Sequence, residues 1–268
     1  MRTVRNPVVN VMVAAAKKAT RRLVRDFGEL ENLQVSRKGP ADFVSNADLR
    51  TEKILHEELS KARPGWGFLM EEQGSIAASG DGLDRWIIDP IDGTTNFLHG
   101  IPHFAISIAH EHDGKLIEGL VYSPIHDEMF WAAKGEGAHL NDRRLRVSGR
   151  SAMSDAIFAT GIPYKGRPGH DEFHRTAGAV MAESAGIRRF GAAALDLAWV
   201  AAGRYDGYWE SGINAWDMAA GLLLVSEAGG YVTDMDGGPD MLAKGSVIAA
   251  NDQLHAPLSR LLSTAPHT

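Results

Sequence analysis

The feature that most constrains the fold is the order in which two hydrophobic periodicities follow one another along the chain. Apolar residues first recur every three or four positions, then follow strand patterns from about residue 104 to 140, and then strand and helix patterns alternate. Because a helix buries one stripe and a strand buries one face, this order requires helices packed on sheets. The sequence therefore predicts a layered α+β or α/β body.

Two amphipathic helices are predicted in the N-terminal part. The first ends at Gly28 and carries an apolar stripe with spacings of three, four or seven: Val9, Met12, Val13, Ala16, Leu23 and Phe27. Basic residues lie mainly off this stripe, so the pattern favours a helix of the folded body over the signal peptide that the start of the chain loosely imitates. The second helix is expected from about Asp48 to Arg63.

The rest of the chain predicts two sheets. The segments FAISIAHEH, LIEGLVYS and EMFWAAKGEGAHLN are typical of an antiparallel meander. Beyond them, the strand patterns AIFATG, IRRFG, YDGYWE, YVTDM and SVIAAN are interspersed with helices. We therefore expect one domain over residues 1–268, whose lobes, 1–150 and 151–268, would meet near Arg146 to Ser154.

Composition and charge narrow the class of protein. With 34 acidic and 28 basic residues the net charge is −6, so direct binding to nucleic acid is not expected. No apolar run approaches the roughly 18 residues of a membrane span, so no membrane contact is expected. The chain has no cysteine, which excludes disulfides and fits a reducing compartment; we expect a cytoplasmic protein.

The stretch RWIIDPIDGTTNFLHG, residues 85–100, places two aspartates three positions apart. The apolar residues before them predict a strand that stops at Pro90, which would put Asp89 at a strand end. Asp92 and Gly93 are typical of a tight turn, and the Thr-Thr-Asn that follows can cap a turn or a helix. Taken alone, the pattern is ordinary turn chemistry.

Three further carboxylates flank predicted elements. Glu71 follows the short strand pattern FLM, Asp217 opens an apolar helix, and Asp48 opens the second helix. An exposed loop would explain Glu71, and a helix cap would explain each of the other two. Together with Asp89 and Asp92, however, they offer the carboxylate oxygens that Mg²⁺ prefers.

Two segments, WIIDPIDGTTNF (86–97) and WDMAAGLLLVSEAGG (216–230), resemble the signatures of the inositol monophosphatase family, the Mg²⁺-dependent, lithium-sensitive phosphatases. Other segments resemble the family in the same order: KGPADFVSNAD (38–48), the Glu pair at 71 and 72, RFGAAALDLAWVAAGRYDGYWESG (189–212) and GSVIAAN (245–251). The bacterial branch is the most similar. The resemblance implies one phosphatase domain with an αβαβα sandwich.

The resemblance also implies two to three Mg²⁺ ions. Glu71, Asp89 and the backbone carbonyl of Ile91 would hold the first ion. Asp89, Asp92 and Asp217 would hold the second, so that Asp89 bridges the two. A third, more weakly bound ion would lie near Glu71 and water.

The implied catalytic residues are Thr94, Asp48 and Glu71. Thr94, hydrogen-bonded to Asp48, would orient the attacking water and help to deprotonate it. The N–H groups of Gly93 and Thr94 would hold the phosphate oxygens, as the first turn of a helix can.

The implied substrate contacts lie elsewhere in the chain. Lys38 would lie on a loop over the metal ions, while Glu210 and the backbone around Ala193 would contact the alcohol part of the substrate. Before and after the Glu pair, Met70 and Gln73 depart from residues common in the family, which leaves Glu71 in place but changes its surroundings.

The expected reaction is hydrolysis of a phosphate monoester by metal-activated water, with myo-inositol 1-phosphate as the first candidate substrate. Histidinol phosphate, fructose 1,6-bisphosphate and a nucleotide phosphate remain alternatives, as does a binding role with the transcription machinery. A homodimer is also implied, and the strand block from Phe104 to Asn141 with exposed aromatic residues is the expected interface.

Histidines and aromatic residues outside these motifs favour structural explanations. His110 and His112 would lie on one side of a strand, where a wet edge is a simpler explanation than a transition-metal site. The aromatic residues of the second half are expected in the core and at interfaces: Tyr205, Tyr208, Trp209 and Trp216.

Overall fold

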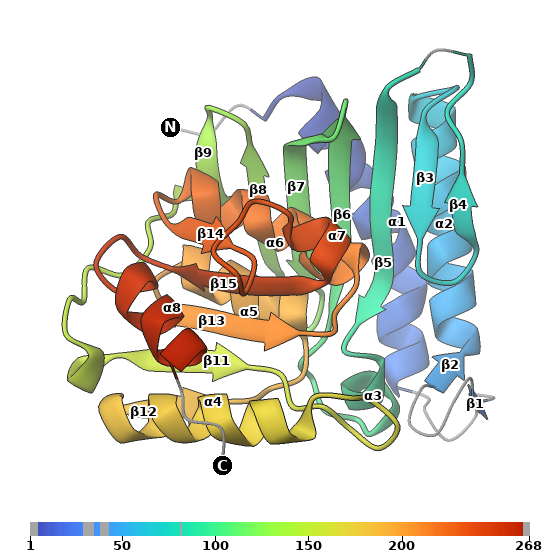
Figure 1. The fold of residues 1–268 in the computed structure, drawn as a ribbon. Helices are drawn as coiled ribbons and strands as arrows, with labels where there is room; N and C mark the ends of the chain where they lie inside the picture. The colour runs from blue at the N-terminus through green and yellow to red at the C-terminus, as the bar shows by residue number, and fades with distance from the viewer. Residues whose placement is uncertain (1–4, 29–34, 38–42, 81, 265–268) are drawn as a thin grey trace.

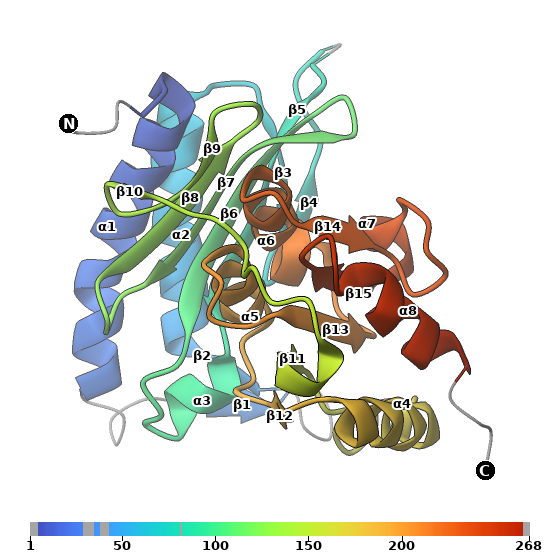
Figure 2. The ribbon, with the colours of Figure 1, turned by 90° about the vertical axis from the view of Figure 1, so that its left-hand side faces the viewer.

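The protein consists of five layers of helices and sheets, which can be followed in Figure 1 and, turned by 90°, in Figure 2. The computed structural model describes residues 5–28, 35–37, 43–80 and 82–264. Two N-terminal helices cover one face of an eight-stranded sheet, two helices lie between this sheet and a five-stranded sheet, and two more cover the outer face of the latter. The predicted αβαβα sandwich is confirmed.

The helices have the following bounds: α1 (Pro7–Gly28), α2 (Asn46–Ala62), α3 (Thr94–Leu98), α4 (His170–Glu183), α5 (Ala193–Ala201), α6 (Ala215–Glu227), α7 (Met241–Lys244), α8 (His255–Thr264) and the 3-10 turn η2 (Met153–Asp155). Among the helices of the described residues, none has the length and apolar character needed to cross a membrane.

The larger sheet has the order β10-β9-β8-β7-β6-β5-β3-β4. Its strands are β3 (Gly67–Met70), β4 (Gly74–Ile76), β5 (Asp84–Asp92), β6 (Ala105–His112), β7 (Lys115–Ser123), β8 (Glu128–Ala133), β9 (Gly137–Leu140) and β10 (Arg143–Arg144). All neighbours are antiparallel except β3 and β5. The predicted meander therefore forms β6 to β9, whereas β4, β10 and α3 are elements that the periodicity does not predict.

The smaller sheet has the order β12-β11-β13-β15-β14. Its strands are β11 (Ile157–Thr160), β12 (Gly186–Arg188), β13 (Gly207–Ser211), β14 (Tyr231–Thr233) and β15 (Ser246–Ala250). Strand β11 is parallel to β12 and β13, while β15 is antiparallel to its neighbours. A separate two-stranded sheet pairs β1 (Val35–Arg37) with β2 (Phe43–Ser45).

The two outer helices of the first layer form as their apolar stripe predicts. In α1 the stripe residues Val9, Met12, Ala16 and Leu23 are fully buried, because α1 packs on α2 and on β7. Helix α2 packs on β5 with its own buried face, which includes Leu55.

Helices α5 and α6 are apolar on nearly every side because a sheet lies on each side of the pair. Helix α6 packs against β5 to β9 of the larger sheet and against β14 and β15 of the smaller one. The two helices also approach each other closely: a Cβ added at Gly221 of α6 would lie 2.5 Å from Cβ of Leu197 in α5. This pair of helices therefore joins the two sheets through one apolar core.

The faces of β6 to β9 are covered within the chain, so a dimer interface on this strand block would have to use its turns and edges; the expected interface stays a prediction. Most of these strand residues are buried within the single chain, where α1 packs on β7 and β8 from one side and α6 packs on β6 to β9 from the other. The aromatic residues Tyr205, Tyr208 and Trp209 are likewise core residues, as predicted.

Strand β5 does not stop at Pro90, contrary to prediction. Asp89 pairs with Ser107 and Asp92 pairs with Ala105. Between these pairs β5 has two residues and β6 has one, so β5 carries one extra residue. Pro90 lies in this irregularity, where the missing N–H breaks no regular ladder bond. The insertion turns the end of β5 and brings both aspartates to the same place.

Candidate active site

The predicted carboxylates meet where several elements of the larger sheet and the central helices end. Asp89 and Asp92 come from the end of β5, and Glu71 comes from the turn between β3 and β4. Asp48 lies in the first turn of α2, and Asp217 lies in the first turn of α6. Segments that are distant in the sequence thus contribute to one acidic site.

The centre of this site is a cluster of three aspartates. Carboxylate oxygens of Asp89, Asp92 and Asp217 lie within 4.8 Å of one another, a spacing that allows them to hold one metal ion. Asp89 is 2% exposed, and its Oδ1 accepts a hydrogen bond of 2.9 Å from the N–H of Ile91. This Asx turn leaves Oδ2 of Asp89 for other partners.

Asp92 is held by the start of a helix. Its Oδ1 accepts from the N–H of Ala193 at 3.2 Å, and its Oδ2 accepts from the N–H of Ala194 at 2.8 Å. These are N–H groups of the first turn of α5, where the helix dipole also favours a negative charge. The N–H of Ala193 is therefore bonded within the protein, so a substrate contact at Ala193 has to use other atoms.

Asp217 has the geometry of both a helix cap and a candidate metal ligand, the two explanations that the sequence left open. Its Oδ2 accepts from the N–H of Asn214 at 2.6 Å, in a capping box at the start of α6. An oxygen of the same carboxylate is also part of the aspartate cluster. The helix cap fixes the orientation in which this side chain reaches the site.

The carboxyl groups of the acidic site are buried close together, and this raises the pKa of each of them. Burial, then the charges of Asp217 and Asp48, raise the pKa of Glu71 to about 9. Burial, followed by the charge of Glu71, holds the pKa of Asp89 well above its usual range. Burial, followed by the charge of Asp217, does the same for the pKa of Asp92. Burial also raises the pKa of Asp217 to about 6.

These residues fit a hard divalent cation. Buried carboxylates ionise readily only beside positive charge, and several oxygen ligands converging on one point are the donor set that Mg²⁺ or Ca²⁺ selects. The predicted ligands Glu71, Asp89, Asp92 and Asp217 are thus brought together in space.

Thr94 and Gly93 follow directly after the aspartates. Gly93 adopts the left-handed conformation, with φ 92°, at the start of α3. An added Cβ there would lie 3.1 Å from the carbonyl oxygen of His103, so both the backbone and the space require glycine. The Thr94 hydroxyl donates to the carbonyl oxygen of Ile91 at 3.0 Å, and its predicted bond to Asp48 stays a prediction.

Glu210 lies on β13, a strand of the smaller sheet. Burial raises the pKa of its carboxyl to about 7, and the Tyr208 hydroxyl donates a hydrogen bond to its Oε2. Its side chain passes so close to Gly161 that a Cβ at that position would lie 1.8 Å from Oε1 of Glu210. Gly161 thus leaves the space that this carboxylate occupies.

A cavity of ≈ 540 Å³ connects these groups. Its wall includes Glu71, Asp92, Thr94 and Asp217 from the acidic site, together with Glu210. Residues of the segment before α4 and of the loop before α5 complete it: Tyr164, Arg167 and Arg189. The volume is that of a site for a small molecule.

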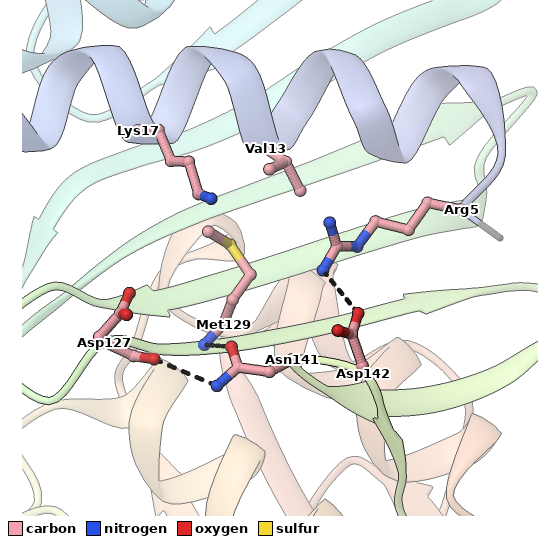
Figure 3. A pocket seen from close by; sticks show the side chains of 7 residues that line it. All are labelled: Arg5, Val13, Lys17, Asp127, Met129, Asn141 and Asp142. Atoms are coloured by element: carbon pink, nitrogen blue, oxygen red, sulfur yellow. Dashed lines mark hydrogen bonds and ion pairs between the residues drawn. The ribbon is translucent and has the colours of Figure 1, made fainter. Parts of the chain in front are cut away.

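A second cavity, of ≈ 380 Å³, lies between α1 and the turns that flank β8 and β9 (Figure 3). Arg5 and Lys17 on the helix side face Asp127 and Asp142 on the strand side. Arg5 pairs with Asp142 at 3.6 Å, and Asp127 accepts from the Tyr122 hydroxyl at 2.8 Å. Charges of both signs offset each other here, unlike in the acidic site.

Two residues at the site, Glu52 and Gly161, are not predicted from the sequence. Glu52 of α2 is buried and bonded to the turn after Glu71. Its spacing of four from Asp48, which places both on one helix face, is a signal that could have found it. No local pattern indicates Gly161 as a neighbour of Glu210. Lys38 lies outside the described residues.

Of the two histidines predicted at a solvent-exposed sheet edge, His110 is buried, so the prediction is wrong for this residue. Its Nδ1 lies 2.6 Å from Glu118 and its Nε2 lies 2.8 Å from Asp84, and its ring stacks on Trp66 with 4.2 Å between the centroids. The residue is 5% exposed, whereas His112 is on the surface.

The class that the fold and the site define is that of the metal-dependent phosphatases, since a layered αβαβα fold places at the ends of its strands and helices an acidic cluster that could hold a metal ion. The chain belongs to the inositol monophosphatase family, whose model matches residues 5–266. This confirms the family predicted from the two sequence signatures.

Individual proteins show how similar the chain is to its relatives. The inositol-1-monophosphatase of Mesorhizobium japonicum is 58% identical over 254 residues, which cover 95% of each chain. The Nus factor SuhB of Pseudomonas aeruginosa is 44% identical over 264 residues, covering 97% of each chain. The crystal structure of the extragenic suppressor protein suhB from Bartonella henselae is 56% identical and superposes with a TM-score of 0.94, covering 97% of this chain and 100% of that one.

Proposed function

We propose that the protein hydrolyses a small phosphate monoester, with myo-inositol 1-phosphate as its substrate and inositol and phosphate as products. The observation that carries the proposal is the cluster of Asp89, Asp92 and Asp217, whose oxygens lie within 4.8 Å of one another beside a cavity. A relative that is 58% identical along nearly the whole chain is named an inositol-1-monophosphatase.

The metal ions in this proposal are two to three Mg²⁺. Glu71, Asp89 and the carbonyl of Ile91 would hold one, and Asp89, Asp92 and Asp217 would hold another. When bound, such ions activate water, neutralise phosphate oxygens and stabilise the leaving alkoxide. The pKa values of these carboxyls, raised by burial and mutual repulsion, support the assignment because a bound cation would restore the ionised form.

The residues after the aspartates would bind the phosphate and orient the water. Gly93 and Thr94 line the cavity at the start of α3, and their N–H groups would donate to phosphate oxygens. The Thr94 hydroxyl uses its proton on the Ile91 carbonyl, so its oxygen can accept a hydrogen bond from water. For this hydroxyl to donate to Asp48 instead, its proton has to turn away from the Ile91 carbonyl.

Glu210 would accept hydrogen bonds from the hydroxyls of the leaving alcohol. Its Oε2 is bonded to Tyr208, which fixes the carboxylate, and both Glu210 and Gly161 line the cavity. Gly191, Ala192 and Ala193 line the same cavity. Lys38, which precedes β2 in the sequence, would act over the metal ions.

Steady-state hydrolysis of a small substrate panel tests the proposal. We expect the highest kcat/KM with inositol 1-phosphate, compared with histidinol phosphate, fructose 1,6-bisphosphate and a nucleotide monophosphate. EDTA should abolish turnover and Li⁺ should inhibit it in the presence of Mg²⁺. Asp252→Asn, an exposed carboxylate outside the site, is the control and should remain active. Full activity in EDTA would overturn the metal mechanism, and a preference for another phosphate would change the substrate.

We further propose that residues 1–268 form a single domain that assembles as a homodimer. Support for a single domain comes from α5 and α6, which pack on both sheets. For the dimer, Ile101 and Phe190 are exposed by 47% and 42%, and Phe190 packs on the ring of His103 two residues beyond Ile101. Light scattering should give a dimer mass for the wild type and a monomer mass for Phe190→Asp. A monomeric wild type at micromolar concentration would refute the dimer.

Binding to a transcription complex is a second candidate function. Its support is the relative from Pseudomonas aeruginosa named as a Nus factor, which is 44% identical. Co-purification of RNA polymerase with the wild type, but not with an unrelated protein of similar charge, would support this role.

A further inference from the structure

Glu71 comes from a short turn, which by itself is a poor support for a metal ligand. The turn links β3 to β4, whose last ladder pair joins Met70 to Gly74. Only Glu71, Glu72 and Gln73 lie between these paired residues, so the ladder does not fix their N–H groups. A ligand on such a turn keeps its geometry only when another element holds the backbone.

Glu52 of α2 holds this backbone with both of its oxygens. Oε2 accepts from the N–H of Glu72 at 2.8 Å, and Oε1 accepts from the N–H of Gln73 at 2.9 Å. Hydrogen bonds to an ionised carboxylate are stronger than neutral ones, and two parallel bonds fix direction as well as distance. Glu52 is 0% exposed, so water does not compete for these bonds.

The same helix face also carries Asp48, one turn before Glu52. The charge of Asp48 raises the pKa of both Glu71 and Asp89, which places it beside the metal-ligand candidates. Helix α2 is itself fixed by buried Leu55 and Leu59 and by its packing on α1 and β5. Its buried face can therefore set the position of the site residue Asp48 directly and of the turn through Glu52.

We infer that Glu52 is a positioning residue that orients Glu71 toward the metal ions by holding the N–H groups of Glu72 and Gln73. The inference rests on the proposed function, because it assigns Glu71 as a metal ligand. Glu52 itself is not assigned as a ligand, because both of its oxygens already accept hydrogen bonds from backbone N–H groups of the turn. Its contribution is the preorganisation of the site before metal binds.

The test compares Glu52→Gln with Glu57→Gln. Glutamine keeps the shape of the side chain but presents an NH₂ group to one of the two backbone donors, whereas Glu57 is exposed on the same helix and serves as the matched control. Calorimetric titration with Mg²⁺ should show an affinity lowered by about 10- to 100-fold in Glu52→Gln, as is usual for groups that orient metal ligands. Affinity in Glu57→Gln should equal that of the wild type.

Two further readouts separate positioning from general stability. At saturating Mg²⁺ the kcat of Glu52→Gln should recover to within several-fold of the wild type, because only the metal-binding step is impaired. In the wild type, without any substitution, hydrogen exchange should show the amides of Glu72 and Gln73 protected as strongly as the interior of α2. Rapid exchange of both amides would overturn the inference even if Glu52→Gln did not fold.

Failure of the inference and failure of the proposed function give different results. Unchanged Mg²⁺ affinity in folded Glu52→Gln, with an active wild type, would overturn the role of Glu52 alone. A wild type that binds Mg²⁺ but hydrolyses no phosphate monoester would overturn the function, while a lowered affinity in Glu52→Gln would still support the positioning role.

Discussion

Replacing Asp217 by Asn should make the protein more stable in EDTA while abolishing its activity. Asp217 both caps α6 and contributes to the acidic cluster. Burial raises the pKa of its carboxyl from 3.8 to about 6, which at about 1.4 kcal/mol per pKa unit corresponds to about 3 kcal/mol of lost stability at neutral pH.

The asparagine variant removes this cost but weakens the cap. Its side-chain oxygen can still accept from the N–H of Asn214, so the loss is that of a charge-assisted bond relative to a neutral one, about 1 kcal/mol. We therefore expect a net gain of about 2 kcal/mol in the free energy of unfolding at pH 7.5 in EDTA.

The pH dependence has a defined sign. A carboxyl whose pKa is raised on folding binds more protons in the folded state, so the wild type loses stability relative to the variant as the pH rises through the window from 3.8 to about 6. The difference between the two proteins should be small at the lower end of this window and reach its full value above the upper end.

Urea unfolding followed by tryptophan fluorescence measures this difference, since the chain has six tryptophans. Asn214→Ala is the control, because it weakens the capping box without removing a charge and should destabilise by about 1 kcal/mol at every pH. A destabilised Asp217→Asn in EDTA, with no dependence on pH, would show that Asp217 is only a cap and that the electrostatic reasoning is wrong.

Three other substitutions test single roles in the site. Asp89→Asn should weaken both metal sites and abolish turnover even at high Mg²⁺; near-normal turnover would contradict its bridging role. Thr94→Ala should keep Mg²⁺ binding by calorimetry while kcat falls by roughly 10²- to 10⁴-fold, and loss of metal binding would contradict a role in orienting water. Gly161→Ala should displace the Glu210 carboxylate, whose Oε1 would lie 1.8 Å from the new Cβ, and raise KM for inositol 1-phosphate more than it lowers kcat. An unchanged KM would show that Glu210 does not contact the substrate.

Much of the architecture and the acidic cluster is predictable because the relevant signals are local. The stripe that includes Val9, Met12 and Leu23 specifies one buried face of α1 whatever lies opposite it. The runs of β-prone residues in the meander likewise predict β6 to β9, because short turns join neighbouring strands. Asp89, Asp92 and Asp217 are predictable as a group because their segments resemble two family signatures.

What joins these segments was decided only by the tertiary structure. The N–H groups that bind the Asp92 carboxylate belong to α5, about a hundred residues away, and the carboxylate that holds the turn after Glu71 comes from Glu52. His110 is buried because Trp66 and two carboxylates from other strands surround it. The path of β5 past Pro90 depends on its pairing with β6. The register between these two strands does not follow from the strand propensity of either segment.

The physical reason lies in the range of the interactions. Hydrophobic periodicity and turn chemistry act between residues a few positions apart, so each segment carries its own information about helix, strand and turn. Hydrogen bonds to buried carboxylates, the repulsion that raises the pKa of Glu71 and the close approach of Gly161 to Glu210 arise only when distant segments pack together. The sequence alone therefore determined the layers and the chemical character of the site, whereas the packing decided how each carboxylate is held and how strongly its charge is opposed.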